Sequence, residues 1–292
     1  MDLQQLRYVV AVAEEASFTR AAARCFVAQS GLSHRIKSLE DELGVSLFSR
    51  TSRRVELTAS GEAFLTSARA SLNAADRAAA DAVAAAGQIR GLLRVGVIPT
   101  VTAVDVSMAL KAFRQEHPHV RIALQVAGSD ELETAIGRGD MDVGMLGLPE
   151  GREPRGVAWR NLGYDRLVAV VNRDHRLAQK RETTLSEIAQ ETFADFPAGT
   201  PARAESDLAF AAAGMHRDVA FESMAIGLTI DLIRHNLAIA LLPSRYAPHN
   251  PSLAHLSIAD GPSRVEYLAW SDFNPSPAAQ AFLSIINDAN VI

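Results

Sequence analysis

The chain of 292 residues is long enough for two or three domains, since single domains commonly hold about 100–150 residues. Its 48% hydrophobic and 22% charged residues argue against wholesale disorder, and no uncharged run reaches the roughly 18 apolar residues of a bilayer span. The net charge of −5 at first argues against a nucleic-acid partner, and the single cysteine, Cys25, excludes an intramolecular disulfide and a multi-cysteine metal cluster. The first residues lack the pattern of an export signal, so we expect a cytoplasmic protein without a membrane partner.

Basic residues are concentrated in two short stretches near the amino terminus. Residues 16–39 contain Arg20, Arg24, Arg35 and Lys37 and no acid, and residues 43–55 contain three more arginines, again without an acid. Basic charge confined to short stretches of an acidic chain indicates a local site for a polyanion. Charge alone would fit a solvated surface equally well, so the secondary structure has to decide.

The first 57 residues have the periodicity of three short helices and a hairpin. We predict a first helix ending near residue 15, a second with Ser17 as its N-cap, and a third beginning near residue 29 or 30. The third helix buries a stripe with intervals of four, three and four: Leu32, Ile36, Leu39 and Leu43. The inward positions of the first two helices are predicted to be Leu3, Leu6, Val10, Ala13, Phe18, Ala21, Ala22 and Cys25. Residues 47–57 have the pattern of a two-stranded hairpin with a basic tip.

Two helices joined by a tight break, the second starting with small polar and basic side chains, match a helix-turn-helix. A helix fits the DNA major groove, where short hydrogen-bonding side chains near its start can reach base edges. Arginines on the hairpin would contact phosphates and position the module. The candidate base-reading residues are Gln29, Ser30, Ser33, His34 and Lys37, and the candidate phosphate-binding residues are Arg50, Arg53 and Arg54.

Residues 58–90 are rich in alanine and predict one long helix. Thr58 could cap it, with Glu62 in the first turn. Apolar residues follow one another at alternating intervals of three and four, which is a heptad seam: Leu65, Ala68, Leu72, Ala75, Ala79, Ala82, Ala86 and Ile89. A helix lying on its own core would give the same seam. A lone exposed helix of this length is marginal in water, so we favour a dimer contact.

From about residue 92 onward, β-branched runs alternate with helical patterns. The predicted strands are residues 92–98, 120–126, 143–146, 167–171, 219–221, 238–241 and 264–270. The predicted helices are residues 102–115, 131–138, 185–189, 203–213, 224–235 and 277–286. The order indicates two α/β halves, which usually bind a ligand in the cleft at the carboxyl ends of their strands.

Helix starts that point into such a cleft offer unpaired amide groups and partial positive charge to an anion. The candidate starts are residues 99–102, 128–129, 198–200 and 222–223. Each of their polar residues could equally be a satisfied N-cap. Asp130 and Glu222 adjoin these starts and would oppose an anion, so the sequence leaves the charge of the ligand open.

The first 65 residues resemble the LysR-type transcriptional regulator family. The matching segments are LQQLRY at 3–8, SFTRAA at 17–22, VAQS at 27–30, LSHRIKSLE at 32–40, LGVSLFSR at 43–50 and LTASG at 57–61. The remaining chain resembles the family more loosely, in the order of its elements. Two residues depart from the pattern: Gly31 replaces a helix former, and His34 replaces a longer polar or basic residue.

The resemblance implies an α plus α/β architecture in three parts. Residues 1–57 would form a winged helix-turn-helix, 58–90 a dimerising linker helix, and 91–292 an effector domain similar to type 2 periplasmic binding proteins. Within it, lobe I would comprise residues 91–162 and 267–292, and lobe II residues 163–266, with crossover strands near residues 162–165 and 263–267.

The resemblance also implies the partners. They are double-stranded DNA with an interrupted inverted repeat, a small-molecule effector, further copies in a homodimer or homotetramer, and RNA polymerase. The residues implied to line the effector site are Thr100, Val101, Ser129, Thr200 and Ser223, with Phe196 and Leu146 as its apolar wall.

Other functions find less support in the sequence. We find no phosphate loop, no spaced zinc-protease histidines and no nucleophile elbow, so we expect neither an enzyme nor a cofactor or metal site. The alternative is a cytoplasmic solute-binding protein whose N-terminal helices only mediate dimerisation. Residues 16–39 contain basic residues and no acid, and this charge pattern argues against that alternative.

Overall fold

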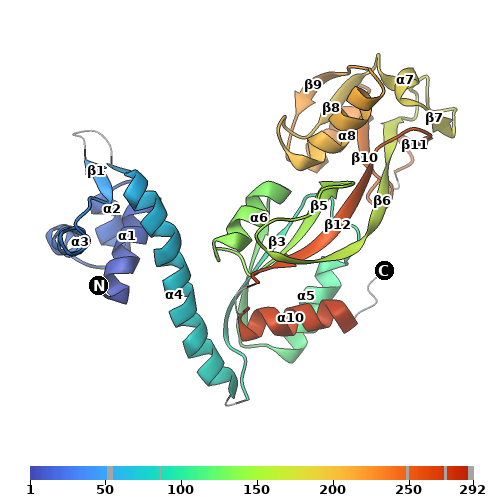
Figure 1. Cartoon of the computed structure of the whole chain (residues 1–292). Coiled ribbons are helices and arrows are strands. Elements are labelled where there is room, and N and C mark those ends of the chain that lie inside the picture. Colours follow the sequence, from blue (N-terminus) through green and yellow to red (C-terminus); the bar gives the residue numbers. More distant parts are fainter. Residues whose placement is uncertain (51–54, 86, 248–249, 273–274, 289–292) are drawn as a thin grey trace. The chain divides into compact units, whose positions relative to one another are not determined.

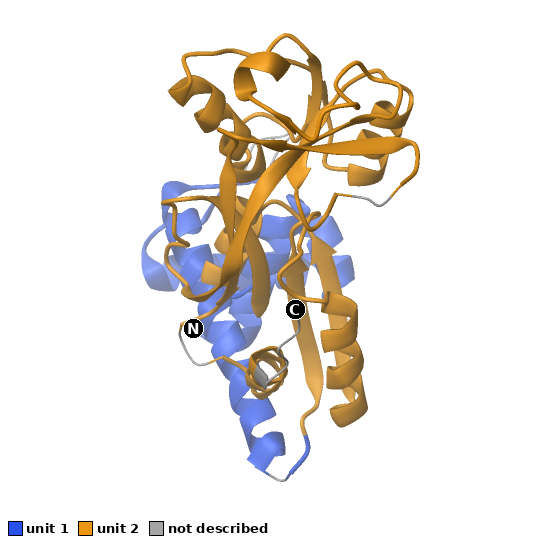
Figure 2. Ribbon diagram, turned by 90° about the vertical axis from the view of Figure 1, so that its right-hand side faces the viewer, with its two compact units in different colours: residues 1–88, 138–140 blue, residues 89–137, 141–292 orange. Residues whose placement is uncertain are grey.

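The computed structural model describes residues 1–292 except 51–54, 86, 248–249, 273–274 and 289–292 (Figure 1). The chain divides into two compact units, coloured separately in Figure 2. Unit 1 comprises residues 1–88 with 138–140, and unit 2 comprises residues 89–137 with 141–292. Among the described residues, no helix combines the length and the apolar character that crossing a bilayer requires.

Unit 1 contains the three helices, the hairpin and the long helix that the sequence predicts. Its elements are α1 (Leu3–Glu15), α2 (Phe18–Arg24), α3 (Gln29–Leu43), β1 (Phe48–Arg50), β2 (Val55–Leu57) and α4 (Ala59–Ala85). Ser17 is the N-cap of α2 and accepts a hydrogen bond from the Arg20 amide, as predicted. The predicted cap of the long helix is also confirmed, because the Thr58 hydroxyl accepts from the Gly61 amide at 3.0 Å.

The core of unit 1 lies between α1, α2 and α3. Leu32, Ile36 and Leu39 are completely buried, which confirms the predicted stripe of α3. Its predicted fourth member, Leu43, is 40% exposed, because α3 ends there and Gly44 turns the chain with a φ of 70°.

The inward face predicted for α1 is partly wrong. Leu3 is exposed and Val10 is half-buried, whereas Val9 and Val12 are completely buried. The reason is that α1 packs against α2, α3 and α4 together, so the residues facing its neighbours form a broader surface than one stripe. In α2 the prediction holds for Phe18, which is buried, as are Ala21 and Ala22, while Cys25 is half-buried at the C-cap.

The hairpin is held tightly to the start of α4. Phe48 pairs with Leu57 across the antiparallel strands β1 and β2. The Thr58 amide donates to the Leu47 carbonyl at 3.0 Å, and a Cβ added to Gly61 would lie 2.0 Å from that same carbonyl oxygen. Glycine at position 61 therefore allows α4 to begin directly against the hairpin.

Unit 2 is an α/β structure with two lobes. Its elements are β3 (Gly91–Val97), α5 (Val106–Glu116), β4 (Val120–Val126), α6 (Ser129–Gly137), β5 (Val143–Pro149), β6 (Ala158–Asn172), β7 (Glu182–Thr183), α7 (Leu185–Ile188), β8 (Thr192–Asp195), α8 (Pro201–Ala212), β9 (Asp218–Glu222), α9 (Ile226–Arg234), β10 (Ala240–Pro243), β11 (Leu253–Ile258), β12 (Ser263–Trp270) and α10 (Pro277–Asp288).

Strands β6 and β12 connect the lobes (Figure 1). In lobe I the strand order is β4-β3-β5-β12-β6, and in lobe II the second half of β6 pairs with β10 and β11, with β7 next to β11. Strands β8 and β9 pair in parallel, and an isolated bridge joins Phe193 of β8 to Ile239. The crossover segments that the resemblance implies, near residues 162–165 and 263–267, fall within these two strands.

Several predicted boundaries differ from the structure. Strand β6 begins at Ala158, not at residue 167, because its first half pairs with β12, and strands β7, β8 and β11 are additional. Helix α5 begins at Val106 after the N-cap Asp105, not at residue 102. Helix α4 ends at Ala85, so Ile89 lies beyond it and packs against the core of lobe I.

Candidate functional site

The N-terminal half of α3 presents the predicted base-reading residues on its outer side. Of these residues, Gln29, Ser30, His34 and Lys37 are exposed, and Ser33 is half-buried beside the core stripe. The N-cap position is occupied by Ala28, whose methyl side chain cannot accept a hydrogen bond from the first amides of the helix. The beginning of α3 therefore combines hydrogen-bonding side chains with backbone amides that no cap side chain covers.

The cations of the basic stretch are paired with acids outside it. Lys37 lies 2.8 Å from Asp41, one turn further along α3. Arg24 lies 2.7 Å from Glu14 at the end of α1, and the hydrogen bond with Glu14 raises the pKa of Arg24. Such exposed ion pairs contribute little free energy, so these cations can exchange a carboxylate for another anion at low cost. The linear count of charges could not show this pairing.

The hairpin wing is anchored to α3 through a buried carboxylate. Glu40 is 7% exposed and accepts hydrogen bonds from the backbone amides of Leu47 at 2.7 Å and Phe48 at 3.2 Å. Of the three wing arginines predicted to contact phosphates, Arg50 belongs to β1, and Arg53 and Arg54 lie outside the described residues. The wing is thus fixed relative to the helix that carries the candidate base-reading residues.

The predicted seam of the linker helix is divided between two environments. Ala68 is buried, and α4 packs along α1 in this region. Further along, Ala79 and Ala82 are exposed, and Val83 is 41% exposed. Of the other seam residues on this helix, Leu65, Leu72 and Ala75 are half-buried, and Ala86 lies outside the described residues. The second half of the helix therefore leaves small apolar side chains uncovered in the single chain.

A cavity with about 320 Å³ of empty space, part of it open to solvent, lies between the two lobes of unit 2. Its lining residues are Ile98, Pro99, Thr100, Gly128, Ser129, Gly147, Phe196, Thr200, Pro201, Ala202, Glu205, Met224 and Arg264. Four of the predicted effector-site residues are thereby brought together: Thr100, Ser129, Phe196 and Thr200.

Thr100 belongs to a buried polar cluster in lobe I. Arg264 is 1% exposed, donates from Nη1 to the Thr100 hydroxyl at 2.7 Å and forms an ion pair with Glu266. The Glu266 carboxylate also accepts from the amides of Thr102 at 2.9 Å and Ala103 at 3.0 Å. These amides are therefore engaged, and the prediction that residues 99–102 form an open helix start is wrong.

Two helix starts do reach the cavity. Ser129 is the first residue of α6, and its buried hydroxyl donates to the Gly147 carbonyl at 2.8 Å and accepts from the Gly147 amide at 3.0 Å. Thr200 is the N-cap of α8, as predicted, and its hydroxyl accepts from the Arg203 amide and donates to the Pro197 carbonyl. Both hydroxyls hold the cavity wall in place.

Three predicted residues lie away from the cavity lining. Leu146 is completely buried in the core of lobe I, because β5 is a central strand with both faces covered. Val101 is half-buried between two apolar clusters of lobe I. Ser223 lines a smaller neighbouring cavity with Asp195 and Thr229, and its hydroxyl accepts from the Ala225 amide, since α9 begins only at Ile226.

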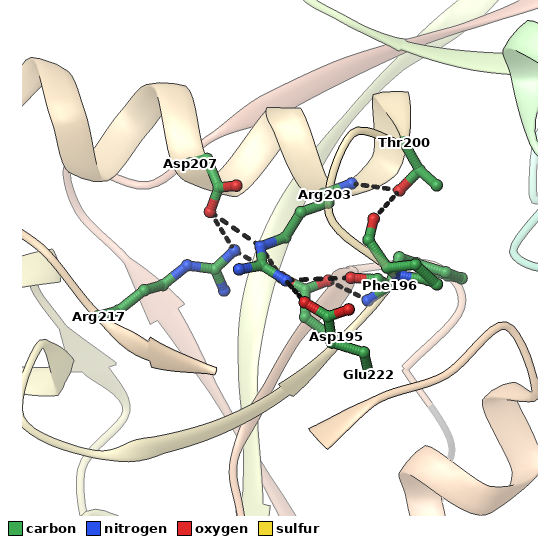
Figure 3. A network of polar contacts seen from close by, with 8 residues as sticks. Asp195, Phe196, Thr200, Arg203, Asp207, Arg217 and Glu222 are labelled. Carbon is green, nitrogen blue, oxygen red and sulfur yellow. Dashed lines mark hydrogen bonds and ion pairs between the residues drawn. The ribbon is translucent and has the colours of Figure 1, made fainter. Parts of the chain in front are cut away.

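An arginine and aspartate network supports the cavity wall from lobe II (Figure 3). Arg217 lies 2.6 Å from Asp195 and 2.8 Å from Asp207. Arg203 contacts Asp207 at 3.0 Å and donates to the Phe196 carbonyl at 3.2 Å. Burial raises the pKa of the Asp195 carboxyl, and the charge of Arg217 opposes that shift. The network fixes the segment from Phe196 to the start of α8.

Glu205 and Arg264 are lining residues that the sequence interpretation missed. Burial raises the pKa of Glu205 to about 8. A signal for Glu205 was present, because the inward positions of α8 run Pro201, Glu205 and Phe210, which places a charged residue within a buried stripe. The sequence contains no such signal for Arg264, because a charged residue at the end of a strand usually lies in solvent.

The comparisons with known proteins agree with this arrangement. Residues 3–62 match the family model described as "Bacterial regulatory helix-turn-helix protein, lysR family", and residues 86–290 match the "LysR substrate binding domain". The second match alone covers more than half of the chain. This protein belongs to the LysR family.

Individual relatives of this LysR-family regulator resemble it over their full length. It is 32% identical to the uncharacterized HTH-type transcriptional regulator YnfL of Escherichia coli K12, over 97% of this chain and 96% of YnfL. It is 31% identical to the Hca operon transcriptional activator HcaR of the same organism, over 99% and 98% of the two chains. A crystal structure of full-length CbnR complexed with its target DNA has a TM-score of 0.68 and 25% identity, with 99% of each chain covered.

The family membership decides between the functions that the sequence left open. The protein is a LysR-type transcriptional regulator with a DNA-binding helix-turn-helix and an effector-binding domain. The match of residues 3–62 to a DNA-binding module argues against a solute-binding protein with a merely dimerising N-terminus. The names of the relatives confirm the expectation of a regulator and not an enzyme.

Proposed function

We propose that the outer face of α3 reads DNA bases in the major groove, through Gln29, Ser30, Ser33, His34 and Lys37. Arg50, Arg53 and Arg54 of the wing contact phosphates on the same duplex. The observation that carries this proposal is the exposure of the α3 face, opposite the completely buried stripe of the same helix. Side chains near the start of a recognition helix are those that reach base edges.

Base reading can be separated from general affinity by substitution on α3. We expect Ser33→Ala and His34→Ala each to reduce discrimination between target and random duplex by about 1–3 kcal/mol, the typical value of a well-formed hydrogen bond to a base edge. Ser38→Ala is the matched control, because Ser38 is exposed on the same helix but outside the proposed face. Competition gel shifts with the intergenic region upstream of the gene measure this. Unchanged discrimination in both α3 variants would contradict the assignment.

We propose further that two copies of the chain associate through α4, and that dimers pair into a tetramer. The uncovered small side chains between Ala75 and Ala85 support the dimer, since small residues let two helices approach closely. A two-fold dimer presents two α3 helices, which suits an interrupted inverted repeat. Such a regulator acts on chromosomal DNA next to RNA polymerase, and we therefore propose that it works in the cytoplasm.

The cavity between the lobes is our proposed effector site, lined by Thr100, Ser129, Phe196 and Thr200. A ligand there touches both lobes and can therefore favour one arrangement of the lobes over another. Gly128→Phe tests the site, because a Cβ at Gly128 meets no atom within 4 Å and the ring can fill the cavity. We expect this variant to bind DNA and to lose its response to effector.

A further inference from the structure

The cavity wall contains a buried carboxyl group that the fold itself does not use. Glu205 is 5% exposed and lines the cavity from the first turns of α8. Its Oε1 atom has no hydrogen-bond partner within the described part of the chain. A buried polar atom without a hydrogen-bond partner lowers the stability of the fold. We therefore look for a functional role of this carboxyl group.

The arginine that lines the cavity, Arg264, is engaged by other residues. Arg264 forms an ion pair with Glu266 and hydrogen bonds with Thr100, and no ion pair joins it to Glu205 in the described residues. The charge of Arg264 lowers the pKa of Glu205, and the charge of Glu266 opposes that effect. Glu205 is therefore left without a cation of its own, which favours the neutral, protonated carboxyl.

The other charged groups around Glu205 either raise its pKa or are paired with a group of opposite charge. Asp195 of β8 and Asp165 of β6 add negative charge, and burial is the largest cause that raises the pKa of Glu205 to about 8. On α8 itself, Arg203 is engaged by Asp207 at 3.0 Å. At neutral pH the Glu205 side chain thus carries a proton that it can donate.

The same cavity receives the first turns of two helices. Ser129 begins α6, and Pro201 and Ala202 begin α8, so the partial positive charges of two helix N-termini meet there. The two carboxylates next to these helix starts are paired with arginines. Asp130 forms an ion pair with Arg152. Glu222 lies 3.1 Å from Arg203. These surroundings favour a negatively charged ligand group.

We propose that the effector is a small organic carboxylate, held between the first turns of α6 and α8, and that protonated Glu205 donates a hydrogen bond to it. This proposal rests on the effector role proposed above for the cavity. The Glu205 O–H donates to a ligand carboxylate oxygen, and no bond other than hydrogen bonds forms. Loss of the proton places two carboxylates side by side in a buried site. Binding is therefore coupled to retention of the proton, and affinity falls as the pH rises above about 8.

The experiment compares matched acids and amines as probes of the full-length chain. Acetate, propanoate and benzoate, with ethylamine, propylamine and benzylamine as their counterparts, are titrated calorimetrically at pH 6.5 and pH 9. We expect at least one acid to bind, with affinity about tenfold weaker at pH 9, and no amine to bind. Glu205→Gln retains a hydrogen-bond donor and is expected to bind the same acid with equal affinity at both pH values. Glu205→Leu removes the donor and is expected to bind at least tenfold more weakly.

Several results would overturn the proposal. One is that none of the three acids binds, or that an amine binds in place of its acid. Another is that the affinity for the acid is the same at both pH values. A third is that Glu205→Leu leaves this affinity unchanged. The Gly128→Phe variant separates this inference from the proposed function. If that variant abolishes binding while the Glu205 variants bind as the parent does, the cavity is the effector site and the role of Glu205 is wrong. If an acid binds equally well to Gly128→Phe, the cavity is not its site.

Discussion

The carboxylate of Glu40 accepts a hydrogen bond from the backbone amide of Leu47 at 2.7 Å. Glu40 lies on α3, eleven residues after the helix begins, and Leu47 leads into β1. One buried side chain thereby sets the position of the wing relative to the helix that carries the base-reading face. Base reading and phosphate contact are coupled through this link, since displacement of the wing would move its arginines away from the duplex.

Removing this link should destabilise unit 1. We expect Glu40→Ala to lower the free energy of unfolding by about 1–3 kcal/mol, because two buried backbone amides lose their acceptor. Circular dichroism during urea unfolding of the full chain measures the change. Glu42→Ala is the control, since Glu42 is exposed and its carboxylate lies at the surface, 2.9 Å from the N-terminal amine. Equal effects of the two substitutions would contradict the anchoring role of Glu40.

We expect Gly31→Ala to increase the stability of unit 1. A Cβ added to Gly31 meets no atom within 4 Å, and alanine is favoured over glycine inside a helix by about 0.5–1 kcal/mol. Gly44→Ala should destabilise the same unit, because Gly44 has a φ of 70°. Thermal unfolding of both variants gives the comparison. A loss of stability in Gly31→Ala would show that the start of α3 departs from regular helix.

Charges placed on the exposed half of α4 should dissociate the dimer. The double variant Ala75→Glu with Ala79→Glu introduces like charges into the proposed contact, so we expect a lower molecular mass by light scattering. Ala74→Glu with Ala78→Glu is the matched control, because both residues are exposed and lie on the adjacent face. A parental mass in the first variant, or the same decrease in both, would argue against the seam as the contact.

Glu205 should make the stability of unit 2 depend on pH. Its pKa is raised to about 8 in the folded chain from an ordinary value of 4.5, so between these values the folded state binds more protons than the unfolded state. The contribution of Glu205 to stability therefore falls as the pH rises through this window, by up to about 1.4 kcal/mol per pH unit.

The variant Glu205→Gln carries no titrating group at this position. We expect its stability to decline less than that of the parent between pH 5.5 and pH 8. Urea unfolding followed by the fluorescence of Trp159 and Trp270, which both lie in unit 2, measures the difference. Glu182→Gln serves as control, since Glu182 is exposed. Parallel pH profiles of the parent and Glu205→Gln would contradict the raised pKa.

Much of the fold follows from local patterns in the sequence. The stripe of Leu32, Ile36 and Leu39 predicts α3 because its period matches a helix, and Ser17 and Thr200 predict helix starts because their hydroxyls can cap amides. Strand β6 was predicted too short, since its first half is amphipathic and owes its strand conformation to pairing with β12. Pairing between distant segments leaves little trace in a local window.

The candidate sites could be predicted from the sequence only where their residues lie on one element. Residues on one helix, such as Gln29 and His34, share a face that periodicity reveals. The cavity joins residues that are far apart in the chain, and Arg264 reaches Thr100 across 164 positions. Leu146 was predicted to line the effector site on the resemblance alone. It lies in the core of lobe I, because both faces of β5 are covered. Spatial contacts between lobes could not be derived from spacing.

We propose that the chain recognises particular DNA sequences through unit 1 and responds to a ligand in unit 2. The most direct test of this proposal is the affinity of the full chain for the upstream intergenic fragment and for random duplex, at moderate salt, with and without the carboxylate that binds. We expect tighter binding to the intergenic fragment, and a change in affinity or footprint on adding the carboxylate. Equal affinity for both duplexes under all conditions would contradict it.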